Sequence, residues 1–184
     1  MGRWPLLLRN LPADLSDGVI LLDAHRMEDA EAHLLGEDEE MRRRFDAVRP
    51  ATLNETRQAL ERWIAARDCG GDPMFAYAMR ELSGQLIGGC ELRMRSANSA
   101  NLSYWVFAPF RGRGYALRAV NLLASAAERI AGLNRLELRI APDHESSRRV
   151  ARKAGFTEEG TVEEKAWTGA LSTMEFYTKD VSRG

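Results

Sequence analysis

A loop rich in glycine and arginine is the segment of this sequence best suited to binding an anion. Residues 108–114 read Ala-Pro-Phe-Arg-Gly-Arg-Gly, between a stretch typical of a β-strand and a stretch typical of a long helix. The first turn of a helix has unpaired N–H groups and a partial positive charge, so it favours phosphate. Gly112 and Gly114 allow the backbone to approach such an anion closely. Because Arg111 and Arg113 add guanidinium donors, the spacing predicts a phosphate site at the start of this helix.

Three other interpretations of the same loop compete with this one. A P-loop is excluded, because the sequence contains no Gly-x-x-x-x-Gly-Lys-Ser/Thr. A dinucleotide-binding fingerprint fails at its third position, where Leu117 replaces glycine or alanine. An ordinary tight turn that uses the glycines for its own geometry fits equally well. The loop alone therefore does not identify a function.

Composition narrows the classes of protein to consider. The chain has 184 residues, 45% of them hydrophobic and 29% charged, a balance typical of a single globular domain. A formal net charge of −1 argues against nonspecific binding to nucleic acid, which requires a basic surface. No stretch approaches the roughly 18 apolar residues that a membrane helix requires. We therefore expect a cytoplasmic protein that binds neither nucleic acid nor a membrane.

Cysteine and histidine are too few and too scattered for a metal site. The two cysteines are Cys69 and Cys90, and the three histidines, His25, His33 and His144, show no ligand spacing. Among the 26 basic residues, lysine is rare and arginine dominates, which indicates the codon bias of a GC-rich, bacterial genome. We expect no metal cofactor.

Hydrophobic periodicity predicts a mixed sheet with helices on its faces. The predicted strands are residues 19–22, 74–81, 85–95, 101–107, 136–140, 156–163 and 171–179. The predicted helices are residues 27–34, 41–48, 52–64, 116–130 and 145–154. Short turns rich in serine, glycine and asparagine make the second, third and fourth strands antiparallel neighbours. The order indicates an α/β fold with α+β character, in a single domain over residues 1–184 whose residues 1–17 form an N-terminal arm.

Three segments together resemble one enzyme superfamily. Arg111-x-x-Gly114-x-Ala116 after a β-strand resembles the acyl-coenzyme A pyrophosphate loop of GNAT superfamily N-acetyltransferases. The longer segment 104–116 is similar to the branch that contains the ribosomal-protein-alanine N-acetyltransferases. A second segment of that branch is matched by His144-x-x-Ser147-x-x-Val150-x-x-Lys153-x-Gly155-Phe156-x-x-Glu159-Gly160. With Ile87-Gly88 upstream, the matches cover residues 18–180 in the family's order.

The resemblance implies where the coenzyme binds. It implies a mostly antiparallel sheet that splays after the fourth strand, with the pantetheine arm of acetyl-CoA in the opening. The residues implied for the coenzyme are Val106, Phe107, Ala108, Arg111, Gly112, Arg113, Gly114, Tyr115, Ala116, His144 and Ser147. In this arrangement backbone groups of Val106 and Ala108 bond the pantetheine, and the N–H groups of residues 111–116 hold the pyrophosphate.

Two positions depart from the family's pattern. His144 replaces an asparagine that bonds the pantetheine amide, and a neutral histidine can still donate one hydrogen bond. Ala151 replaces a tyrosine that protonates the departing thiolate in many members. Resemblance to the ribosomal branch suggests Ser147 as the proton donor. Ser147 also fits a purely structural role, in which its hydroxyl bonds a free N–H at the start of a helix.

Carboxylates in two places are candidates for the acceptor side of the reaction. Glu37 and Asp38 begin an acidic run, residues 37–40, in the region that the family uses for the acceptor, where a carboxylate could attract an amine and take its proton. A solvated helix start explains the run as well. Glu91 is a second candidate base, if strand alternation turns it toward the open face of the sheet, and a surface position is an equal alternative.

These observations predict an acetyl-CoA-dependent N-acetyltransferase that transfers the acetyl group directly to a primary amine. The amine is a protein N-terminus or an amine of a small molecule, and the protein is a monomer or a homodimer. Neither cysteine stands where a covalent acyl-enzyme is expected. A noncatalytic module that binds or senses acyl-CoA remains the alternative, because of the changes at His144 and Ala151.

Overall fold

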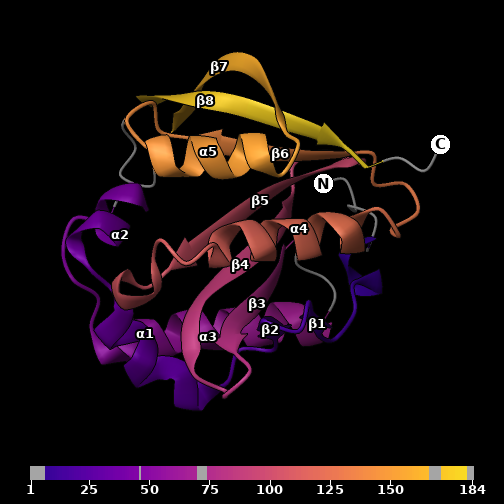
Figure 1. Ribbon diagram of the computed structural model, residues 1–184. Helices are drawn as coiled ribbons and strands as arrows, with labels where there is room; N and C mark the ends of the chain where they lie inside the picture. Colours follow the sequence, from indigo (N-terminus) through magenta and orange to yellow (C-terminus); the bar gives the residue numbers. More distant parts are fainter. Residues whose placement is uncertain (1–6, 46, 70–73, 166–170, 182–184) are drawn as a thin grey trace.

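An eight-stranded mixed sheet forms the centre of the molecule, with the strands in the order β1-β2-β3-β4-β5-β6-β8-β7 (Figure 1). The computed structural model describes residues 7–45, 47–69, 74–165 and 171–181. The strands are β1 (Leu15–Ser16), β2 (Ile20–Asp23), β3 (Met74–Glu81), β4 (Leu86–Met94), β5 (Ser99–Val106), β6 (Arg135–Ile140), β7 (Thr157–Lys165) and β8 (Leu171–Asp180). Neighbours pair antiparallel except β5 and β6, which are parallel.

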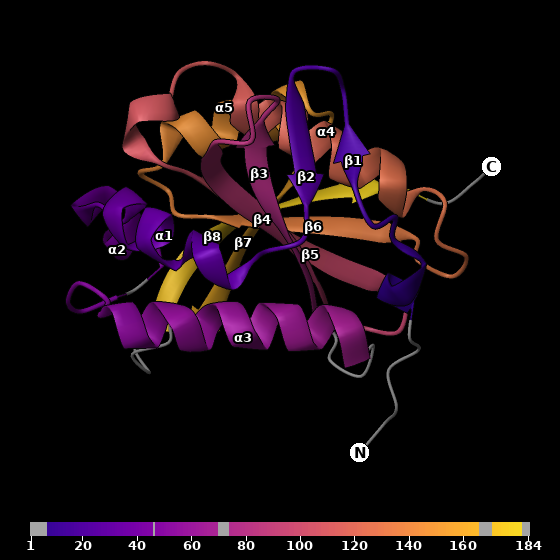
Figure 2. The same cartoon turned by 90° about the horizontal axis from the view of Figure 1, so that it is seen from below.

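Helices cover both faces of the sheet. The α-helices are α1 (Ala30–Gly36), α2 (Glu39–Arg44), α3 (Leu53–Cys69), α4 (Tyr115–Ala127) and α5 (Glu145–Lys153). Three short 3₁₀ helices are η1 (Leu7–Asn10), η2 (Met27–Asp29) and η3 (Ala108–Phe110). Figure 2 shows α3 along one face and α4 and α5 on the opposite side. In the described part of the chain no helix is long and apolar enough to cross a membrane.

Local sequence explains where the longest helix begins. Thr52 and Glu55 form a capping box at the start of α3. The Thr52 hydroxyl accepts a hydrogen bond from the Glu55 N–H at 3.3 Å, and the Glu55 carboxylate accepts one from the Thr52 N–H at 2.8 Å. These two bonds satisfy N–H groups that have no partner inside the helix.

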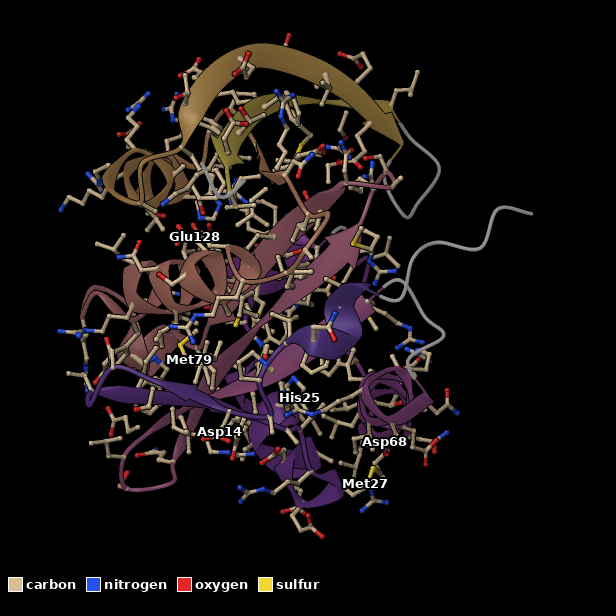
Figure 3. All side chains as sticks on the ribbon, turned by 90° about the vertical axis from the view of Figure 1, so that its right-hand side faces the viewer. Asp14, His25, Met27, Asp68, Met79 and Glu128 are labelled. Carbon is tan, nitrogen blue, oxygen red and sulfur yellow. The ribbon has the colours of Figure 1, made fainter. Side chains whose placement is uncertain are left out.

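Strand alternation sends the side chains of the sheet into two separate cores. Cys90, Leu92 and Leu102 belong to a large core that also contains the apolar face of α4. Trp105 and Phe107 belong to a smaller core on the other face, beside α1 and α3. Figure 3 shows Met79 on the α4 side and His25 on the other side, and the space between ribbons is filled by side chains.

The sheet opens between β5 and β6. These strands pair only over Ser99–Asn101 and Arg135–Glu137, and within the described residues they share no further pairs, although β5 continues to Val106 and β6 to Ile140. The predicted mixed, mostly antiparallel sheet that splays after its fourth predicted strand is therefore confirmed. Gly88 in β4 allows β5 to come close here, because a Cβ at Gly88 would lie 2.2 Å from the Trp105 carbonyl oxygen.

Two segments differ from the sequence prediction. Residues 15–16, predicted as part of an arm, form β1 and pair with β2, while Leu8 and Leu11 are buried in the large core. The cause is a tight turn at Asp17, whose carboxylate accepts from the N–H groups of Val19 and Ile20 at 2.9 and 3.0 Å. The helix predicted at 41–48 is the shorter α2, closed by a hydrogen bond from the Ala47 N–H to the Arg42 carbonyl. Residues 70–73, whose Gly-Gly-Asp-Pro sequence predicts a turn, lie outside the described residues.

Candidate functional site

A cavity of about 380 Å³ lies at the opening of the sheet. Its walls come from β5, the loop before α4, the first turn of α4, α5 with the residue before it, and α2 with Phe45. Eight of the residues predicted for the coenzyme line this cavity: Val106, Arg111, Gly112, Gly114, Tyr115, Ala116, His144 and Ser147. The fold thus brings together, on one surface, residues from the two separate motifs.

Three predicted coenzyme residues, all in the described part of the chain, do not line the cavity. The Phe107 ring is buried against α1, where a Cβ at Gly36 would lie 2.5 Å from it. Ala108 is exposed at the start of η3. The Arg113 guanidinium lies 5.4 Å from the Phe110 ring centre and 3.8 Å from the Glu81 carboxylate. From the loop, the residues that line the cavity are therefore Phe110, Arg111, Gly112 and Gly114.

The N-terminus of α4 has the form expected of an anion site. Gly114 is its N-cap residue with a φ of 81°, and Gly112 has a φ of 79°. A Cβ at either position would meet no heavy atom of the described residues within 4 Å, so the space beside both glycines is open. Because left-handed φ values strain residues that carry a Cβ, glycine suits both positions. The open space and the N–H groups of the first turn fit a phosphate group of a coenzyme.

The side chain of Arg111 holds this loop to two other elements. Its Nε donates to the Val106 carbonyl at 2.9 Å, and its two terminal nitrogens donate to the Asp38 carboxylate at 2.6 and 2.9 Å. Asp38 is also the N-cap of α2 and accepts from the Met41 N–H at 2.8 Å. The Arg111 hydrogen bonds lower the pKa of Asp38, so this carboxylate is charged at neutral pH.

A second connection crosses the opening from β5 to α5. The Tyr104 hydroxyl donates a hydrogen bond to the Ser147 Oγ at 3.0 Å, and both side chains line the cavity. Burial raises the pKa of Tyr104, so the phenol is neutral and can donate. The N-cap residue of α5, His144, forms no side-chain capping hydrogen bond, and the Ser147 Oγ accepts from Tyr104.

Sequence reasoning did not single out Tyr104. The signal was present, because Tyr104 alternates with Leu102 and Val106 in β5, and Val106 was already predicted at the site. What the sequence lacked was any indication that α5 would bring Ser147 opposite that position. Ala151, one turn after Ser147, is fully buried and has only a methyl group, so it donates no proton.

His144 precedes α5 and lines the cavity. Burial lowers the pKa of His144 below its usual value, and the nearby Arg44 lowers it further. The imidazole is therefore neutral at pH 7, with one N–H donor and one acceptor nitrogen. This state fits the single hydrogen bond predicted from the replacement of asparagine.

The predicted acceptor residues occupy different surroundings from one another. Glu37 and Asp38, both in the described part of the chain, do not line the cavity. Glu37 accepts from the Ala51 N–H at 3.2 Å and pairs with Arg42 at 3.5 Å. Glu40, from the same acidic run, does line the cavity and pairs with Arg44 at 2.8 Å. The acidic run therefore both organises α2 and contributes one carboxylate to the cavity wall.

Ion pairs tie α2 to the far side of the opening. Arg44 pairs with Asp143 at 2.5 Å and Arg43 pairs with it at 3.2 Å, in the turn between β6 and α5. Together with the pair between Asp38 and Arg111, these contacts join α2 to the elements on both sides of the cavity.

Glu91 lies on the face of β4 that points toward α3. Its register partner in β5 is Ser103, its side chain is 14% exposed, and it pairs with Arg93 at 3.5 Å. It does not line the cavity described above, so its role as a base stays a prediction. In the described ranges no three His, Cys, Asp or Glu side chains are grouped so that they could hold a metal.

Comparison with known proteins agrees with the geometry. A family model described as "Acetyltransferase (GNAT) domain" matches residues 20–157. No curated protein matches the sequence. Among solved structures, the microcin C7 self-immunity acetyltransferase MccE, in complex with acetyl-CoA and AMP, is similar with a TM-score of 0.79 at 18% identity, over 94% of this chain and 99% of that one.

Two further solved structures carry names from the branch predicted from sequence. RimL, a ribosomal L7/L12 α-N-protein acetyltransferase in complex with coenzyme A, has a TM-score of 0.77 at 19% identity, over 92% of this chain and 97% of that one. RimJ of Mycobacterium smegmatis, in complex with a coenzyme A disulfide, has a TM-score of 0.74 at 22% identity, over 92% of this chain and 86% of that one. The family resemblance of the sequence is confirmed, and the chain belongs to the GNAT family of N-acetyltransferases, with acetyl-CoA as its cosubstrate.

Proposed function

We propose that this protein transfers the acetyl group of acetyl-CoA directly to a primary amine, on a protein N-terminus or on a small molecule, in the cytoplasm of a bacterium and as a monomer or homodimer. One observation carries the proposal. The cavity in the sheet opening joins a helix N-terminus suited to an anion, a hydrogen-bonded pair of hydroxyls from Tyr104 and Ser147, and a neutral histidine. Each of these groups suits one portion of a coenzyme thioester.

We assign coenzyme binding to the loop and to α5. The N–H groups of residues 111–116 would hold the pyrophosphate, supported by the open space beside Gly112 and Gly114. Backbone groups of Val106 and Ala108 and the His144 imidazole would bond the pantetheine arm. Arg111 would act mainly by holding the loop, because its guanidinium is already bonded to Asp38 and Val106.

The chemical step follows from the groups near the opening. A neutral amine would attack the thioester carbon, a backbone N–H at the end of β5 would polarise the carbonyl, and Ser147 would supply a proton to the departing sulfur. Glu91 would serve as the base for the amine. Cys90 is fully buried and burial raises the pKa of its thiol, which favours direct transfer over an acyl-enzyme at this residue.

The acceptor is proposed as a class. The name of RimL, an α-N-protein acetyltransferase, favours a protein N-terminus, whereas MccE is named for self-immunity to microcin C7 and its structure contains AMP. On this chain, Glu40 on the cavity wall would attract a cationic amine, while Glu37 and Asp38 would act on the acceptor by holding α2 in place.

Turnover with a panel of amines tests the proposal. The purified protein would be incubated with acetyl-CoA and with peptides of different N-terminal residues, polyamines, aminoglycosides or aminoacyl nucleotides, and free thiol release would be compared with acetyl-CoA alone. Mass spectrometry would locate the added acetyl group. We expect amine-dependent release with at least one class. Stabilisation by acetyl-CoA without turnover on any amine would instead indicate a noncatalytic acyl-CoA-binding or sensing module, and no stabilisation at millimolar acetyl-CoA would contradict the coenzyme site.

A further inference from the structure

Tyr104 occupies a position that no other tyrosine of this chain shares. Its hydroxyl is directed at a second hydroxyl on the cavity wall, the Ser147 Oγ. The hydroxyls of the other three tyrosines donate hydrogen bonds to other groups: Tyr115 to Glu81, Tyr77 to the Pro12 carbonyl, and Tyr177 to Glu158 and Glu175. The two hydroxyls that meet across the opening come from β5 and α5, which approach each other only because the sheet splays.

The direction of this hydrogen bond sets the direction of the next one. Tyr104 donates to the Ser147 Oγ and so occupies one of its lone pairs. The Ser147 hydrogen must then point away from Tyr104. Because Ser147 is nine-tenths buried and lines the cavity, the open direction for its hydrogen is the cavity itself. Ser146, also on the wall, is exposed, so Ser147 is the protected hydroxyl at this place.

Acid strength argues that Ser147 does not supply a proton alone. An aliphatic hydroxyl is about as weak an acid as water. A thiol, with a usual pKa of about 8.5, is a far stronger acid, so transfer of a proton from an isolated serine to the departing thiolate is strongly uphill. A phenol has a usual pKa of about 10, and although burial raises the pKa of Tyr104, its phenol is a stronger acid than the serine hydroxyl. A tyrosine that donates a proton to Ser147, while Ser147 donates its own proton to sulfur, makes the overall proton transfer much less unfavourable.

We propose that Tyr104 is a positioning residue for proton delivery, which aims the Ser147 hydrogen into the cavity and replaces that proton when Ser147 releases it. The inference rests on the proposed acetyl transfer and adds a residue to it. It also accounts for the loss of a tyrosine at Ala151, because a phenol reaches the same hydroxyl from β5.

Each proton in the proposed transfer has a donor and an acceptor. As the amine nitrogen bonds to the acetyl carbon, the carbon–sulfur bond breaks and the Ser147 proton passes to sulfur. The Tyr104 proton passes to the Ser147 Oγ. The phenolate then takes a proton from water at the cavity, where Tyr104 is partly exposed, and the amine nitrogen releases one to its base and then to solvent. Burial raises the pKa of Tyr104, which keeps the phenol loaded before each turnover and makes the phenolate short-lived.

Single-turnover rates of four variants test the role of Tyr104. At saturating acetyl-CoA, Tyr104→Phe and Ser147→Ala should each lower the rate by about 10²-fold or more, with little change in the KM for acetyl-CoA. The double variant should be no slower than the slower single variant, because both hydroxyls act in one path. Tyr77→Phe is the matched control, since it also removes a hydroxyl with a bond to protein, here 2.6 Å from the Pro12 carbonyl, but away from the cavity.

A pH profile separates proton delivery from packing. Fluorinated tyrosine at position 104 has a more acidic phenol, so the alkaline limb of the rate should move to lower pH, and a tyrosine that only packs would not move it. An unchanged rate in Tyr104→Phe, or losses that multiply in the double variant, would overturn the inference. Absence of wild-type turnover on every amine would overturn the proposed function together with it, whereas wild-type turnover that Tyr104→Phe retains overturns the role of Tyr104 alone.

Discussion

The guanidinium of Arg111 forms a two-point ion pair with the carboxylate of Asp38, at 2.6 and 2.9 Å, and so joins the loop before α4 to the first turn of α2. Asp38 caps α2 with the same carboxylate, through the Met41 N–H. A residue predicted to meet the acceptor and a residue predicted to meet the coenzyme are therefore bonded to each other. This ion pair therefore links the residues predicted for the coenzyme to those predicted for the acceptor.

Replacing Asp38 by serine or alanine separates its two roles. Asp38→Ser keeps a helix cap and loses the ion pair, whose partners are each about one-third exposed, so we expect a loss of at most about 1 kcal/mol in unfolding free energy. Asp38→Ala also loses the cap and should cost about 1 kcal/mol more. Both should raise the KM for acetyl-CoA, because the loop is no longer held. Urea unfolding of the two variants checks the two unfolding free energies, and steady-state kinetics checks the KM. Equal stability of both variants would show that the Asp38 cap contributes nothing.

Gly114→Ala should weaken acetyl-CoA binding and also lower stability. The φ of Gly114 is 81°, a left-handed value that costs a residue with a Cβ about 1–2 kcal/mol. The added methyl would meet no heavy atom of the described residues within 4 Å, so it would stand in the open space proposed for the pyrophosphate. Gly18→Ala is the matched control, with a φ of 80° and equally open surroundings, in a turn whose residues do not line the cavity. Calorimetry should find weaker binding in Gly114→Ala alone. Equal affinity in both variants would move the phosphate site elsewhere.

Arg80→Met should be the most damaging single change away from the cavity. Arg80 is almost fully buried and bonds Asp23 at 2.8 Å and Asp29 at 2.7 Å, which ties β3 to β2 and η2. The variant lacks the guanidinium that pairs with the Asp23 and Asp29 carboxylates, which lie in a partly or fully buried site. We expect the free energy of unfolding to fall by about 3–5 kcal/mol. Arg49→Met breaks an exposed pair with Glu55 and should change thermal stability little. Similar thermal shifts in both variants would contradict the importance of burial.

Stability should fall as the pH drops from about 6.5 toward 4. Burial lowers the pKa of His25 to about 3 and that of His33 to about 4; for His25, the neighbouring His33 adds to the effect. An unfolded histidine has a pKa of about 6.5, so in this window the unfolded chain binds more protons than the folded one. Each histidine then removes at most about 1.4 kcal/mol of unfolding free energy per pH unit.

A variant of His25 provides the control for the pH dependence of stability. His25 stacks on Trp63 with ring centres 4.6 Å apart, and Asp29 favours its charged form while Arg80 opposes it. His25→Phe keeps an aromatic ring there and should reduce the slope of unfolding free energy against pH between pH 6.5 and 5, leaving the contribution of His33. If the variant and the wild type lose stability with the same slope, His25 does not titrate in the way inferred.

The order of strands and helices was predictable because it depends on local patterns. The continuous apolar run in residues 74–79 and the helical spacing in residues 116–130 predicted β3 and α4, the first with the same bounds as in the structure. The β1 strand was missed, although Asp17-Gly18 is a known hairpin signal, because a two-residue strand has too little alternation to detect. The end of α2 was missed for a similar reason: apolar spacing at Met41, Phe45 and Val48 continues past the point where the backbone turns.

The sequence by itself determined the family and the order of most strands and helices, because both depend on residue types within short segments. Tertiary structure alone decided which side chains meet across segments. Tyr104 and Ser147 are 43 residues apart and Arg111 and Asp38 are 73 apart, and no local pattern encodes either pair. These contacts depend on how far β5 and β6 diverge and on where α2 crosses the opening, both of which follow from the packing of the whole domain.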